Sequence, residues 1–194
     1  MMRKNIKKIA LATVLVASSL SAGEYDFNTH SLFAIEGGYS TLNADVNNAG
    51  YSIQKSEMAD IGLKLGAEGD NYRVFLSGRY YNAENDNIVA TAGGEVQYMF
   101  NFSKPVNFFI GANAGASYVK IGPSSDGVLP SASITTPYYG GDMGFNYHAT
   151  PLMDLELGVR HMHMNGTMTS GASTYDISGI TSAYASVIIK WKMD

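Results

Sequence analysis

The chain has 194 residues, a formal net charge of −4, no cysteine and only 15% charged residues. The missing cysteine excludes a disulfide scaffold, a thiolate metal site and a cysteine nucleophile, and the acidic balance argues against a nucleic-acid partner. A hydrophobic content of 45% excludes a disordered chain, and no run of about 18 apolar residues is present for a membrane-spanning helix. The composition leaves one folded domain, rich in glycine with 21 residues and in tyrosine with 13.

Residues 1–22 are predicted to be a secretory signal peptide. Four basic residues lie among the first eight, an apolar run follows at 9–16, and small residues at 18–22 suit cleavage. We place the cut after Ala22, with Ser21 as the alternative, and assign residues 23–194 to one domain. A short amphipathic helix is the other interpretation, but the run is too uniformly apolar for it. Removing these residues, which hold four bases and no acid, changes the net charge from −4 to −8.

The rest of the chain alternates between apolar and polar residues with a period of two, which is typical of β-strands. Eight strands are predicted, at residues 32–41, 58–68, 72–81, 88–100, 106–119, 137–148, 152–164 and 177–191. No internal repeat or domain linker is visible. The pattern therefore predicts an all-β domain.

The predicted connections alternate in length. The longer ones are 42–57, 82–87, 120–136 and 165–176, and the shorter ones are 69–71, 101–105 and 149–151. Short turns at one end and long loops at the other are typical of an outer-membrane barrel. A soluble sandwich or barrel has no reason to sort its loops in this way.

The charged residues share one face of the predicted strands. In the second strand, for example, Ile61, Leu63 and Leu65 lie on one face, and Asp60 and Lys64 lie on the other. Because lipid surrounds a membrane barrel, its polar face must point inward. The residues predicted to form a paired, charged network in the lumen are Glu36, Asp60, Lys64, Glu68, Arg73, Arg79, Glu95, Asp142, Asp154, Glu156, Arg160 and Lys190.

Aromatic residues on the apolar faces gather at strand ends. Beside the chain ends or the short turns lie Phe33, Tyr72, Tyr98, Phe100, Phe108, Phe145, Tyr147 and Trp191, and beside the longer connections lie Tyr39, Tyr80, Tyr118 and Tyr139. Amphipathic rings favour the level of lipid headgroups, so two bands predict two membrane interfaces. Cross-strand aromatic pairs in a soluble sandwich are the alternative, but they do not explain the sorting to strand ends.

These features resemble the small outer-membrane β-barrel proteins of Gram-negative bacteria, a group that includes OmpX, the membrane domain of OmpA and the opacity-type surface proteins. The resemblance rests on the signal peptide, the early strand at 33–40 and a last strand whose alternate apolar residues end at Trp191. Three residues, Lys192, Met193 and Asp194, follow that aromatic and depart from the family's usual end. The resemblance implies an eight-stranded antiparallel up-and-down transmembrane β-barrel with both termini in the periplasm.

His161 and His163 form the most conspicuous local motif. Two histidines on one face of a strand can contribute to a metal site, but polar residues at a membrane–water boundary explain the motif more simply. His30 and His148 are predicted near the opposite end and do not complete a site. No catalytic, cofactor-binding or metal-binding residue is therefore assigned, and no cofactor is expected.

Two alternatives assign chemistry to the chain. The lipid A deacylases are eight-stranded barrels with a His-x-Ser pair on a late strand, and the run at 160–166 is similar in placement. Asn165 stands two positions after His163, however, so the nucleophilic hydroxyl of an acyl transfer is missing. The loop acids Glu84, Asp86, Asp126 and Asp176 suggest a protease-like acidic site or a calcium site, but they lack the spacing of a calcium loop and are expected to be solvated.

We expect a non-enzymatic outer-membrane protein with a structural or surface-interaction role and a lumen filled by side chains. A small-conductance, porin-like channel and a lipid A-modifying enzyme remain the alternatives. The expected partners are outer-membrane lipids and lipopolysaccharide, the barrel-assembly machinery through the C-terminal strand, and an extracellular or host-surface ligand at loops 42–57, 120–136 and 165–176.

Overall fold

The structure, a computed structural model, describes residues 30–47, 54–83, 87–102, 105–122, 131–170 and 173–192. These residues form eight strands: β1 His30–Asn47, β2 Gln54–Glu68, β3 Tyr72–Ala83, β4 Ile88–Asn101, β5 Val106–Ile121, β6 Ala132–Thr150, β7 Met153–Ser170 and β8 Ser173–Lys192. Within the described ranges no helix is long and apolar enough to cross a membrane. The predicted signal peptide and its cleavage site lie outside these ranges.

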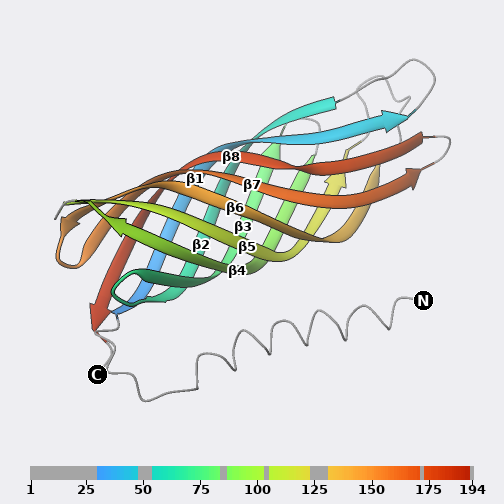
Figure 1. The fold of residues 1–194 in the computed structure, drawn as a ribbon. Coiled ribbons are helices and arrows are strands. Elements are labelled where there is room, and N and C mark those ends of the chain that lie inside the picture. Colours follow the sequence, from blue (N-terminus) through green and yellow to red (C-terminus); the bar gives the residue numbers. More distant parts are fainter. Residues whose placement is uncertain are drawn as a thin grey trace, which may run out of the picture.

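The sheet closes on itself to form a barrel. Each strand pairs in antiparallel fashion with the next one in the chain, and β8 pairs with β1 (Figure 1). At the seam His30 lies opposite Lys192, and Ala44 lies opposite Ile177. This arrangement confirms the predicted eight-stranded antiparallel barrel.

The two ends of the barrel differ. At the end that we call the short-turn end lie the start of β1, the end of β8 and the turns β2–β3, β4–β5 and β6–β7. The β2–β3 turn is closed by a hydrogen bond from the Gly69 amide to the Tyr72 carbonyl, 2.8 Å long. The other four connections lie at the opposite end, which we call the far end. The two ends match the predicted alternation of connections along the chain.

The strands are longer at the far end than the sequence pattern predicts. Predicted loop 42–57 is largely strand, since β1 runs to Asn47 and β2 begins at Gln54. Predicted loop 120–136 is shortened at both ends, because β5 reaches Ile121 and β6 begins at Ala132. Predicted loop 165–176 is almost entirely strand, because β7 continues to Ser170 and β8 begins at Ser173. The predicted long loops at 42–57 and 165–176 are therefore wrong over most of their length, and the one at 120–136 is wrong at its two ends.

The physical reason is that the polarity of the wall inverts along each long strand. On β7 the outward residues change from Leu157 and Val159 to His163, Thr167 and Thr169. The inward residues of the same strand change from Asp154, Glu156 and Arg160 to Met162, Met164 and Met168. The pattern of an apolar outer face stops where the inversion begins, so it predicts polar loops for these extensions.

The inward apolar residues of the extensions pack into one cluster, which we call the far-end core. Its buried members are Leu42, Ala44, Met58, Tyr81, Val89, Val119, Ile121, Tyr138, Met162, Met164, Met168, Tyr175, Ile177 and Ile180, and Ala132 and Ile134 pack against them. This half of the barrel is therefore built like a soluble barrel, with an apolar inside and a polar outside.

The middle of the barrel has the opposite arrangement. Leu76 and Leu157 on the outer face are each 64% exposed, whereas Lys64 and Arg73 on the inner face are fully buried. A strand crosses a bilayer with roughly 9–11 residues, whereas β8 has 20 and β6 has 19. The apolar part of the wall is thus long enough for a membrane, and the inverted part extends beyond it.

This boundary predicts a large difference between two arginine substitutions on the same face of β7. Leu157→Arg would place a charge in the middle of the apolar wall and is expected to lower the free energy of unfolding by about 2–4 kcal/mol. Thr169→Arg, on the polar extension, is expected to change it by less than about 1 kcal/mol. Denaturant titration of the protein folded into lipid vesicles measures both, and equal costs would contradict the assigned boundary.

Candidate functional site

Twelve charged side chains lie on the inner face of the barrel and come from every strand except β5. They are Glu36, Asp60, Lys64, Glu68, Arg73, Arg79, Glu95, Asp142, Asp154, Glu156, Arg160 and Lys190. Eleven of them are buried, and Glu68, at the short-turn end, has 12% of its side chain exposed. The period of two in each strand brings these residues into a single enclosed space.

The central cluster surrounds the carboxylate of Glu36. The Arg160 guanidinium donates to it over 2.8 Å, the Lys64 ammonium lies 2.9 Å away, and Arg79 also donates to it. Glu95 accepts from Arg79 and lies 3.7 Å from both Lys64 and Arg160. Three bases are thus shared between two acids that come from distant parts of the chain.

A second cluster lies nearer the short-turn end. Arg73 donates to Glu68 and to Asp154, each over 2.5 Å, and its guanidinium lies 3.5 Å from Glu156. Lys190 lies 2.7 Å from Asp154 and 3.2 Å from Glu68. Glu156 also lies 3.2 Å from Lys64 and so joins this cluster to the central one.

The two clusters form one network with equal numbers of acids and bases. Its acids are Glu36, Glu68, Glu95, Asp154 and Glu156, and its bases are Lys64, Arg73, Arg79, Arg160 and Lys190. We call it the ten-charge network. A buried charge without a partner is strongly unfavourable, so this balance is what allows ten ionised groups inside one barrel.

One aromatic ring, that of Tyr184, lies against two of the buried bases. The ring of Tyr184 lies 4.2 Å from the Arg160 guanidinium carbon and 5.0 Å from the Lys64 nitrogen, within the range of cation–π attraction. The ring also lies over Gly158, where an added Cβ would be 2.7 Å from a ring carbon. Glycine at this position therefore gives the ring the space to reach both bases.

Asp60 and Asp142 stand outside the network. Among the described residues neither has a lysine, arginine or histidine nitrogen within ion-pair distance. Asp60 accepts a hydrogen bond from the Ser40 hydroxyl over 2.6 Å. Asp142 accepts from the Gln97 amide over 2.8 Å and from the Asn113 amide over 3.4 Å. The lumen therefore contains two carboxyl groups in excess of its bases.

The far-end core lies beyond this charged layer. Its side chains fill the barrel interior from the Ile180 and Met162 level to the rim at Met168 and Tyr175. The sequence prediction missed this apolar part. Its signal was present, because Met162, Met164 and Met168 continue the same inward alternation as Glu156 and Arg160.

The twelve predicted girdle aromatics lie on the outer wall. Nine are exposed, namely Tyr39, Tyr72, Tyr80, Phe100, Tyr118, Tyr139, Phe145, Tyr147 and Trp191, and Phe33, Tyr98 and Phe108 are half-buried. Near the short-turn end a continuous arc of rings crosses β3 to β6. Its neighbouring centroids are 4.8 to 5.9 Å apart from Tyr72 through Tyr98, Phe100 and Phe108 to Phe145.

The predicted histidine motif faces outward at the polarity boundary. A ring nitrogen of His161 lies 2.9 Å from the Thr181 hydroxyl, and the His163 ring packs edge-on against Tyr139 at 5.1 Å between centroids. His148 lies at the short-turn end, 2.8 Å from Asp154. Among the described residues no group of three or more His, Asp or Glu side chains is arranged to hold a metal ion.

Of the four predicted loop acids, the structure describes only Asp176. Glu84, Asp86 and Asp126 lie outside the described residues. Asp176 lies on β8, where it is exposed and accepts a hydrogen bond from the Thr167 hydroxyl over 2.6 Å. It therefore belongs to the polar outer wall rather than to a loop.

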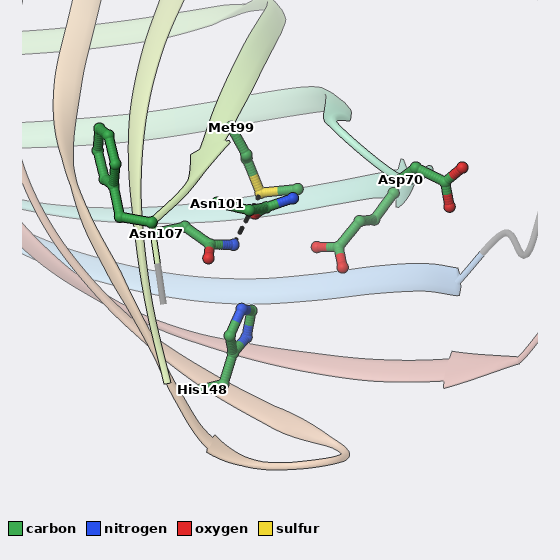
Figure 2. Close-up of a pocket in the computed structure, with 7 residues that line it drawn as sticks. Asp70, Met99, Asn101, Asn107 and His148 are labelled. Atoms are coloured by element: carbon green, nitrogen blue, oxygen red, sulfur yellow. Dashed lines mark hydrogen bonds between the residues drawn. The ribbon is translucent and has the colours of Figure 1, made fainter. Parts of the chain in front are cut away.

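A pocket of about 600 Å³ opens at the short-turn end. Figure 2 shows Met99, Asn101 and Asn107 on one side of it and His148 across from them. The Asn107 amide lies 3.9 Å from the Met99 sulfur. Glu68, Asp70 and Phe102 also line the pocket, and Glu68 is paired there with Arg73 and Lys190.

The closed barrel, with its charged interior and apolar belt, has the fold of the small outer-membrane β-barrels. No family model and no curated protein matches the sequence. Among solved structures, Neisserial surface protein A is 17% identical with a TM-score of 0.60, covering 82% of this chain and 97% of its own. The N-terminal β-barrel domain of Pseudomonas aeruginosa OprF is 13% identical with a TM-score of 0.54, covering 85% and 98%.

A third structure, the outer-membrane protein OprG from Pseudomonas aeruginosa, is 12% identical with a TM-score of 0.52 and covers 84% of this chain and 97% of its own. These likenesses are structural, since few residues are shared. They show that the chain has the fold of the small outer-membrane β-barrels, as the resemblance predicted.

The network predicts unequal effects of two conservative substitutions in the lumen. Glu36→Gln would leave three buried bases with one shared acid fewer and is expected to cost about 3–5 kcal/mol in the free energy of unfolding. Asp60→Asn breaks no ion pair and is expected to cost about 1 kcal/mol or less. Both are measured by denaturant titration in lipid vesicles, and a Glu36→Gln cost no larger than that of Asp60→Asn would contradict the network's role.

Proposed function

We propose that this protein is an integral outer-membrane protein of a Gram-negative bacterium that serves as a closed scaffold with a structural or surface-interaction role. The observation that carries the proposal is the filled interior, in which the far-end core lies over the charge-balanced network. Side chains fill an eight-stranded barrel in any case, and here an apolar layer adds a barrier that hydrated ions do not cross readily.

The proposal includes an orientation. Residues 1–22 would direct export, and the short-turn end with both ends of the barrel would face the periplasm. The outward residues Ala183, Val187, Ile189 and Trp191 at the end of β8 would be read by the barrel-assembly machinery. The far-end extensions would then rise above the outer leaflet, among the sugars of lipopolysaccharide.

The surface offered there includes the polar outer wall of the strand extensions. Its outward residues on β6 to β8 include Thr135, His163, Asn165, Thr167, Thr169, Asp176, Ser178 and Thr181. Hydroxyl, amide and imidazole groups favour hydrogen bonding to sugars or to polar protein surfaces over charge-driven binding. A lipid A-modifying role is not favoured, because His161 is paired with Thr181 and Asn165 holds the position where the deacylases carry serine.

Planar-bilayer recording tests the closed scaffold. The purified, refolded protein is expected to give no stable conductance, because the far-end core places an apolar layer across the lumen. A stable conductance that changes when Arg79→Gln neutralises the lumen would contradict the proposal and establish a channel.

Cell adhesion tests the surface role. Cells that export the protein are expected to adhere to an epithelial cell layer better than cells without it. The double substitution Thr135→Glu and Thr169→Glu is expected to reduce this adhesion several-fold, because it adds charges to the polar wall. The control Asp70→Asn, at the opposite end of the barrel, leaves adhesion unchanged. Adhesion equal in all strains would contradict a surface-binding role.

A further inference from the structure

Strands β6 and β7 stop pairing with each other before they end. Their last register pair towards the far end joins Tyr138 to Met164, although β6 begins at Ala132 and β7 continues to Ser170. On their other sides β6 stays paired with β5, and β7 with β8, up to the far end. Residues 132–137 and 165–170 therefore face each other without a backbone ladder among the described residues, and we call this stretch the β6–β7 slit.

Side chains hold the slit together instead of the backbone. The Thr136 hydroxyl donates to the Asn165 carbonyl over 2.9 Å, and the Ser170 hydroxyl donates to the Ser131 carbonyl over 3.0 Å. The strands are still close, because a Cβ added to Gly166 would lie 3.5 Å from the Thr136 Cβ. A wall without backbone pairs opens locally at a lower free energy than a fully paired one, so the slit is a weak line in the far-end wall.

The slit leads to the far-end core. A pocket of about 430 Å³ opens over it, lined by residues 131–134 of β6 and 167–170 of β7. Two of these residues, Ile134 and Met168, also belong to or pack against the core. Met168 is 5% exposed, whereas Met58, Met162 and Met164 of the same core are at most 1% exposed. Met168 is therefore the core methionine that lies against the pocket in the described part of the chain.

We propose that Met168 is an oxidation-sensitive residue that peroxide reaches from outside through the β6–β7 slit, and that its oxidation loosens the far-end core. The thioether sulfur takes one oxygen atom from hydrogen peroxide, the O–O bond breaks and water leaves. The sulfur is oxidised by two electrons to the sulfoxide, and the peroxide is reduced. Peroxide is small and uncharged, so a slit lined by hydroxyl groups does not repel it.

The sulfoxide does not fit where the thioether lies. Met168 is opposite Tyr175 in the register and packs among the aliphatic and aromatic side chains of the far-end core. A polar oxygen buried there without a donor is unfavourable. Hydroxyl groups at the slit, such as those of Ser131 and Ser133, offer donors on the solvent side. The modified side chain is therefore drawn outward, and the core loses the packing that the thioether supplied.

Peroxide treatment of the protein folded in lipid vesicles tests the proposal, with oxidation at each methionine read by mass spectrometry of peptides. Met168 is expected to be oxidised several-fold faster than Met58 and Met162. The midpoint of thermal unfolding, measured by the loss of fast gel migration on heating, is expected to fall by a few degrees as Met168 is oxidised.

Two leucine variants assign this fall to one residue. Met168→Leu, which keeps an apolar side chain of similar size, is expected to retain its midpoint after the same treatment. The control Met143→Leu removes a methionine that is 48% exposed on the outer wall and is expected to show the full fall. Equal oxidation rates at Met168, Met58 and Met162 would overturn the proposal, as would a fall of the same size in Met168→Leu.

A cross-link tests the route through the slit. The double substitution Thr136→Cys and Gly166→Cys has the Cβ separation of a disulfide, 3.5 Å, and its oxidised form is expected to slow the oxidation of Met168 several-fold. The control Lys120→Cys and Ser133→Cys joins two opposed residues of the paired strands β5 and β6 and is expected to leave the rate unchanged. An unchanged rate in the first variant would show that peroxide does not enter there. None of these results depends on conductance or adhesion.

Discussion

Side chains of a β-strand point alternately to its two faces. A closed sheet with an apolar outer face must therefore enclose every second side chain of each strand. In this barrel that constraint places twelve charged residues inside a space too narrow for bulk water. Ten of them, five acids and five bases, are joined in one continuous network. The low charge content of the chain follows from the same constraint, because an entire cylindrical surface must be kept free of charge.

The inversion of polarity along the strands divides the barrel into two parts held together by different interactions. The apolar-walled part depends on ion pairs and cation–π contacts around Glu36, Lys64 and Arg160. The far-end part depends on the burial of methionine, tyrosine and aliphatic side chains. Because the strands run through both parts without interruption, the far-end core is held as a rigid extension of the membrane-spanning wall. The network occupies the lumen of the first part, and the core occupies that of the second.

Much of the fold could be predicted from the sequence, because the period of two and the order of short and long connections are visible in neighbouring residues of the chain. The inner-face position of Glu36 and Arg160 follows from that period. Their contact does not, because the two residues are 124 positions apart and meet only through the registers of the closed sheet. The sequence pattern predicts loops for the far-end extensions, since their polarity is opposite to the pattern that defines the strands. The surplus of Asp60 and Asp142 does not follow from the sequence either, because it depends on which bases the other five lumen carboxylates meet in the closed sheet.

The polarity inversion is tested most directly by spin-label accessibility along β7. The chain contains no cysteine, so single cysteines can be introduced at the outward positions Leu155, Leu157, Val159, His163, Thr167 and Thr169 and labelled in lipid vesicles. The account predicts that labels at the first three positions are relaxed mainly by oxygen, which dissolves in lipid. It predicts that labels at Thr167 and Thr169 are relaxed mainly by a water-soluble nickel chelate, with the crossover near His161 and His163. Oxygen-dominated relaxation through Thr169, or nickel-dominated relaxation at Leu157, would contradict it.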